Sequence, residues 1–190
     1  MLLWLIGAFA ALNLLLDPIF AVVLPVYAEQ HFGSAVRLGL MVATFGAGTV
    51  AGVVAFGVVG TRLPRRPTLL VAIVMAGLPI WPLALVDAFP VVIGALFVMG
   101  AAIGPISPLV MTILHERVPA AFRGRTFGAM TAITSATIPL GIVITGFAIE
   151  LLDLRMTLLV LAAIYVAVAA TSFVNPAFRQ ISQPLEEAAS

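Results

Sequence analysis

Six long apolar stretches, separated by short polar connections, constrain this chain more than any other feature of its sequence. They run over Leu2–Tyr27, Leu38–Gly60, Thr68–Val86, Pro90–Leu114, Thr126–Ile149 and Met156–Val174. A helix needs about 20 apolar residues to cross the hydrocarbon core of a bilayer. Charged residues are 9% of the chain, whereas soluble domains carry about 25%. The sequence therefore predicts an all-α membrane protein with six transmembrane helices over residues 1–175, followed by a polar cytoplasmic tail, 176–190.

The arginines predict how this bundle is oriented in a cell (inner) membrane. Alternate loops and the tail carry seven of them, namely Arg62, Arg65, Arg66, Arg117, Arg123, Arg125 and Arg179. The loops on the other side carry two, Arg37 and Arg155. Arginine-rich loops stay in the cytoplasm, so both termini are expected there, with the lipid bilayer as the surrounding medium. The arginines form no basic stripe, which disfavours a nucleic-acid partner.

Pairs of glycines four residues apart indicate close helix packing. Gly48 and Gly52 form one G-x-x-x-G step, and Gly100 and Gly104 form another. Such steps let two helix backbones approach closely in lipid. Tight packing is the simpler interpretation of both pairs. A moving interface is the alternative, and the pattern alone does not distinguish them.

Two arginine-rich loops carry the most specific pattern in the sequence. The first reads "GVVGTRLPRRP" and the second "ERVPAAFRGRTFG". They resemble the G-x-x-x-D-R-x-G-R-R and R-x-P-x-x-x-R-G-R-x-F-G loops of the major facilitator superfamily. Thr61 replaces the aspartate and Pro64 the second glycine of the first pattern. The matching residues are Gly57, Arg62, Arg65 and Arg66 in the first loop, and Arg117, Pro119, Arg123, Gly124, Arg125, Phe127 and Gly128 in the second.

The resemblance implies a fold and a function. The family has twelve helices in two six-helix halves, each a 3+3 inverted repeat, so this chain would correspond to helices 7–12. The stretches "DPIFAVVLPVY" and "PLGIVITGFAIELLDLR" are similar to the drug-, macrolide- and siderophore-exporting branch. The expected function is secondary active transport, with proton-coupled efflux of a small organic molecule by alternating access. The missing partner would be an N-terminal six-helix half or a second copy in a homodimer.

Other functions are weighed against this one. A non-transporting six-helix membrane subunit, or a truncated product that needs a partner half, is the main alternative. An intramembrane protease would need a G-x-S-x-G-like serine and a histidine inside a span, and the sequence offers neither. The chain has no cysteine, and His31 and His115 fall on opposite sides of the predicted bundle. Neither a metal site nor a cofactor is therefore expected.

The loop arginines have two interpretations. In the topological one, they hold the loops at the anionic inner surface, at about 1 kcal/mol each. In the gating one, they also form inter-helix ion pairs that break when the transporter switches between its two states. Replacing Arg123 and Arg125 with glutamine would then change the transport rate without affecting insertion.

A carboxylate lies inside the first apolar stretch, at Asp17. A charge near the bilayer centre costs at least about 2.5–3.5 kcal/mol on insertion scales. In one interpretation, Asp17 caps a second half-helix that begins at Pro18 after a local break. In the other, Asp17 faces a water-filled cavity and binds protons or a cationic group. Asn13, four residues earlier, shares its helical face.

Hydroxyl groups on the fifth predicted helix are weaker candidates for the same cavity. Thr131, Thr134 and Ser135 share one face of that helix. Hydroxyls in lipid more often bond to the carbonyls of their own helix or of a neighbour, so lining a cavity is the less favoured role. Trp4 and Trp81 fall near the expected membrane interfaces, where tryptophan is enriched.

Overall fold

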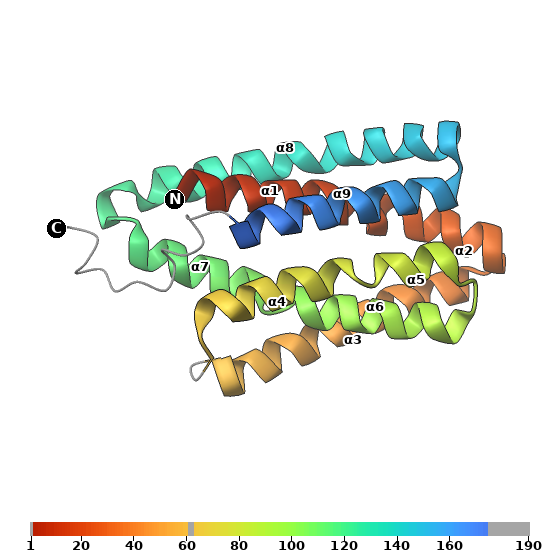
Figure 1. Ribbon diagram of the computed structural model, residues 1–190, viewed down its shortest axis with the longest axis horizontal. Coiled ribbons are helices and arrows are strands. Elements are labelled where there is room, and N and C mark those ends of the chain that lie inside the picture. The colour runs from red at the N-terminus through yellow and green to blue at the C-terminus, as the bar shows by residue number, and fades with distance from the viewer. Residues whose placement is uncertain (1, 61–62, 175–190) are drawn as a thin grey trace.

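The computed structural model describes residues 2–60 and 63–174, and this part of the chain is built from helices joined by short turns (Figure 1). The elements are α1 (Leu2–Pro18), the π-helix η1 (Ile19–Val23), α2 (Leu24–Phe32), α3 (Ala35–Val59), α4 (Arg65–Gly77), α5 (Ile80–Leu85), α6 (Phe89–Ile103), α7 (Ile106–Arg117), α8 (Ala120–Leu152) and α9 (Leu154–Val174). The predicted tail, 176–190, lies outside the described residues.

The predicted six spans are confirmed. Within the described residues, six helical segments are long and apolar enough to cross a membrane. They are Phe9–Phe32, Ala35–Val59, Arg66–Leu85, Phe89–Thr112, Ala121–Leu152 and Leu154–Thr171. The first span combines α1, η1 and α2, the third α4 and α5, and the fourth α6 and α7. The start of α1 and the end of α9 lie at the same end of the bundle, as an even number of crossings requires (Figure 1).

Two spans are interrupted where a glycine and a proline lie within three residues. The third span turns between Gly77 and Ile80, around Pro79, and the fourth turns at Gly104 and Pro105. A proline has no backbone N–H, so it removes one helical hydrogen bond and opens the helix locally. Neighbouring helices can support such openings inside a membrane.

The packing of the spans has the predicted 3+3 symmetry. The second span, α3, packs on the fourth, α6, and the fifth span, α8, packs on the first, α1. The third and sixth spans pack on each other through α4, α5 and α9. Exchanging spans one to three with spans four to six therefore returns these three pairings. Because successive spans run in opposite directions, a shift of three spans also inverts the direction, which makes the repeat an inverted one.

The two glycine pairs meet along one seam between α3 and α6. A Cβ on Gly48 would overlap the carbonyl of Phe97, and a Cβ on Gly52 that of Ala101. In return, a Cβ on Gly104 would lie 2.6 Å from the Thr49 carbonyl oxygen. The predicted close packing is confirmed, and each pair proves to be the partner of the other.

Asp153 alone connects α8 to α9. Its backbone has φ 71°, in the region that side-chain-bearing residues rarely adopt. Its carboxylate accepts a hydrogen bond from the Met156 N–H at 2.9 Å, which caps the first turn of α9. The capping bond helps to offset the cost of this backbone conformation.

Candidate functional site

The helices α3 and α8 are the least covered elements of the bundle. Only 6% of the apolar window of α3 and 11% of that of α8 is buried, against 39–56% for the other four spans. Large apolar side chains, such as Val54 on α3 and Phe147 on α8, are about 60% exposed. The other four spans are covered on more sides, so α3 and α8 form the least covered face of the bundle.

Asp17 lies on α1, between these two uncovered helices. One turn further along the first span, the Phe20 ring packs against Phe45 of α3, with 4.1 Å between ring centroids. On the other side, α8 approaches through Gly141, where a Cβ would lie 2.7 Å from the Leu14 carbonyl oxygen. We call Asn13, Asp17 and Phe20 the Asp17 strip. Asp17 itself is only partly buried.

The predicted cap at Asp17 is wrong, because the helix does not break there. Asp17 lies inside α1, Pro18 keeps helical angles (φ −62°, ψ −24°), and the chain continues into η1 without a side-chain cap. Beyond Pro18 the helix widens into a π-turn, in which the Leu24 N–H donates to the Ile19 carbonyl, five residues back. Single π-turns of this kind occur frequently at functional sites.

The other polar candidates bond to their own helices. The Asn13 side-chain amide donates to the Phe9 carbonyl at 2.7 Å, and the Thr134 hydroxyl donates to the Met130 carbonyl at 2.9 Å. Thr131 and Ser135 are exposed on α8. Gly141 of α8 lies at the level of Asp17, so Thr134 is seven residues, or about 10 Å, along the helix from it. The structure therefore places these hydroxyls on the uncovered side of the bundle but not beside Asp17.

Comparison with known proteins identifies the family. The family model of the Major Facilitator Superfamily matches residues 3–189. The chain belongs to the major facilitator superfamily. It is 30% identical over 164 residues to the multidrug efflux pump Tap of Mycobacterium tuberculosis, and equally to that of Mycobacterium bovis. The match to Tap of Mycolicibacterium fortuitum is 24% identical. Each match covers 86% of this chain but only 39–40% of the relative.

The superfamily-like loop between α7 and α8 is organised by Arg123. Its Nε donates to the Val118 carbonyl at 3.1 Å, and its Nη2 donates to the His115 carbonyl at 2.9 Å. These are the last carbonyls of α7, which have no partner within that helix. His115 packs on Phe127 of α8, with 4.7 Å between ring centroids. Arg123 thus joins the end of α7 to the start of α8.

The remaining motif residues have varied surroundings. Gly57 and Gly124 are open, because a Cβ added at either position would meet no atom within 4 Å, and Arg125 is exposed. Arg66 is partly buried in the first turn of α4. Arg62 lies outside the described residues, as do the side chains of Arg65 and Arg117. Close packing therefore does not explain the presence of glycine at positions 57 and 124 among the described residues.

Sequence reasoning missed a polar cluster at the opposite end of the bundle. His31 lies in the last turn of α2, and its Nε2 is 3.2 Å from the Asp87 carboxylate. Tyr27 stacks on the His31 ring and donates its hydroxyl to the Val86 carbonyl at 3.2 Å. These residues are about 55–60 positions apart in the chain, and no local pattern links them. They tie the end of the first span to the turn between the third and fourth spans.

Proposed function

We propose that this chain is the C-terminal six-helix half of a secondary active exporter of small organic molecules, coupled to protons and working by alternating access. The position of Asp17 is the observation that carries the proposal. Among the described residues, no hydrogen bond or ion pair fixes this carboxylate, and it is partly exposed between the two uncovered helices. Ionisable groups inside membranes mark substrate and proton pathways, and transporters place such groups at the interface of their two halves.

The relatives support the substrate class and the need for a second half. The Tap proteins are named multidrug efflux pumps, and this chain spans about two fifths of their length. Residues 1–175 would form one half-bundle, and the uncovered sides of α3 and α8 would face a second six-helix half or another copy. We place the chain in the cell (inner) membrane with both ends cytoplasmic, because seven of its nine arginines lie on that side.

The proposal is tested on the complete assembly, extracted from membranes and reconstituted into lipid vesicles. Ethidium efflux driven by an imposed pH gradient is compared with ethidium exchange at equal pH on both sides. Asp17→Asn keeps the size of the side chain but cannot cycle a proton at this site. We expect it to reduce gradient-driven efflux at least tenfold while exchange continues.

The matched control is Glu29→Gln, which removes an exposed carboxylate from the outer end of the same span. It should leave both rates unchanged. Full gradient-driven efflux in Asp17→Asn would remove Asp17 from the coupling mechanism. Absence of any flux in the unmodified assembly would favour a non-transporting membrane subunit.

A further inference from the structure

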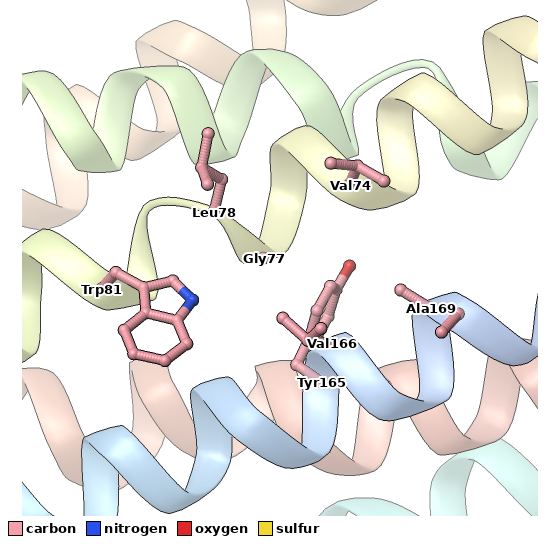
Figure 2. A pocket seen from close by; sticks show the side chains of 8 residues that line it. Val74, Gly77, Leu78, Trp81, Tyr165, Val166 and Ala169 are labelled. Atoms are coloured by element: carbon pink, nitrogen blue, oxygen red, sulfur yellow. The ribbon is translucent and has the colours of Figure 1, made fainter.

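An apolar groove opens between the third and sixth spans. Its walls come from α4, α5, α9 and the turn that joins α4 to α5 (Figure 2). None of the groove's lining residues belongs to α1, α3 or α8, the helices around the Asp17 strip. The groove has a volume of about 200 Å³ and is lined by Val74, Gly77, Leu78, Trp81, Tyr165, Val166, Ala169 and Ala170. It is therefore separate from the proposed transport site.

The groove lies along a spanning helix, inside the apolar part of the bundle. Trp81 is four residues from the end of the span Arg66–Leu85, and Val74 is seven residues deeper, about 10 Å along the helix axis. All of the α9 lining residues lie within the span Leu154–Thr171. Leu78 and Val166, on opposite walls, are 54% and 51% exposed. The medium in contact with the groove is consequently the hydrocarbon of the bilayer.

The shape of the groove depends on the break between α4 and α5. Gly77 lies against the Tyr165 ring so closely that a Cβ would overlap it. The Tyr165 hydroxyl donates to the Ile73 carbonyl at 2.8 Å, so this polar group is already satisfied. The Tyr165 ring and the Gly77 backbone thus form an apolar, rigid floor.

One polar group points into the groove. Figure 2 shows the indole nitrogen of Trp81 directed towards the side on which Gly77 and Tyr165 lie. Among the described residues, no hydrogen bond engages this N–H. A tryptophan N–H that is removed from water usually finds an acceptor. The groove therefore offers apolar walls towards the membrane centre and one donor nearer to the membrane surface.

We propose that this groove binds one acyl chain of a phospholipid, whose ester carbonyl accepts a hydrogen bond from the Trp81 indole. Trp81 lies nearer to the membrane surface than Val74 does. This arrangement fits a lipid of the leaflet at the Asp153 end of the bundle, with its ester near the surface and its chain directed inwards. The volume is below the roughly 300–1,000 Å³ of pockets for drug-sized ligands. The groove lining carries no charged residue, so it selects a chain and not a headgroup.

Brominated lipids can test this proposal on the full chain in its membrane-extracted assembly. The chain has two tryptophans, so Trp4→Phe leaves Trp81 as its only indole. Phosphatidylcholine with brominated chains is titrated into the detergent-solubilised protein, and the fluorescence of Trp81 is followed. We expect quenching that saturates at a few lipids per chain. Quenching that rises in proportion to lipid content, without saturation, would overturn the site.

Two phenylalanine substitutions distinguish lipid binding in the groove from lipid binding elsewhere on the apolar surface. Val166→Phe fills the groove from an exposed position, and Ile164→Phe places the same ring on another exposed face of α9. We expect Val166→Phe to raise the half-saturating lipid concentration at least tenfold and Ile164→Phe to leave it unchanged. Equal effects of the two variants would contradict binding in the groove.

The hydrogen bond is tested with an ether-linked lipid that carries the same brominated chains but no ester carbonyl. The ester lipid should reach half-saturation at a several-fold lower concentration. Equal half-saturating concentrations of the two lipids would show that Trp81 donates no hydrogen bond to the ester.

If a second copy of the chain covers the groove instead, quenching stays weak at all concentrations. A Val166→Cys variant of this cysteine-free chain then forms a disulfide-linked dimer.

Discussion

At the scale of single residues, several amide and hydroxyl side chains of the spanning helices satisfy their hydrogen bonds within their own helix. Asn13, Thr49 and Thr134 each donate to a carbonyl four residues back. An ionised carboxylate only accepts hydrogen bonds, and the middle of a helix has carbonyls but no free N–H groups. Asp17 therefore cannot satisfy itself in the same way. Its residue type alone marked it as the exception in the sequence.

Other parts of the candidate site could not be predicted at this scale. The position of Asp17 between α3 and α8 depends on the contacts of its neighbours Phe20 and Leu14 with Phe45 and Gly141, which are far away in the chain. Trp81 could be recognised as a residue of the membrane interface, but its place in a groove depends on α9. The cap expected at Asp17 was wrong because the chain stays helical through Pro18 and into η1.

Arg123 and Arg125 should have different roles, although both belong to one motif. Arg123→Gln removes two hydrogen bonds to the end of α7, whereas the side chain of Arg125 is exposed. We expect Arg123→Gln to destabilise this turn by about 1 kcal/mol, with several-fold faster hydrogen exchange of the amides at 118 and 120–122. Arg125→Gln should leave exchange there unchanged. Equal exchange in both variants would show that Arg123 does not hold the turn.

At the scale of helices, the seam between α3 and α6 is a contact of backbone with backbone. The sequence predicted that both glycine pairs would pack closely, because only small residues allow such an approach. It could not predict that the pairs would meet, since a G-x-x-x-G step does not specify its partner. The lengths of the six spans were predictable for a simpler reason, because hydrocarbon thickness fixes them.

Alanine substitutions on α3 test this seam. A Cβ on Gly52 would overlap the Ala101 carbonyl, whereas a Cβ on Gly46 would meet nothing within 4 Å. Gly52→Ala should lower the free energy of unfolding by about 1–3 kcal/mol, the usual cost of overpacking. Gly46→Ala should leave it unchanged or raise it by up to about 1 kcal/mol. Unfolding in SDS, followed by circular dichroism, measures both, and similar values would argue against the seam.

At the scale of the whole molecule, the inverted repeat leaves two equivalent helices, α3 and α8, uncovered together. The symmetry of the packing explains why they form a pair, since each is the second helix of its three-helix unit. Counting apolar stretches predicted six spans but could not show which of them lacked neighbours. Which spans lack neighbours depends on how the helices pack, and this packing is seen only in the structure.

The mass of the native particle tests this assembly. An antibody to the tail identifies the chain on a denaturing gel, and light scattering corrected for detergent gives the protein mass of the extracted particle. With a chain of 19.8 kDa, we expect a particle at least about twice as heavy, because the proposed alternating access needs a second six-helix half. A band about twice that mass on the gel would mean that the chain is part of a longer polypeptide. A solitary 19.8 kDa particle would contradict the proposed assembly.

The single residue between α8 and α9 has a mechanical consequence. Asp153 provides no slack, so a tilt of α8 must carry the adjoining end of α9 with it. The joined ends of α8 and α9 therefore move together. Of these two helices, α8 packs on α1, which carries Asp17, and α9 forms a wall of the lipid-facing groove. A displacement of this end of α9 would thereby reach a helix beside Asp17.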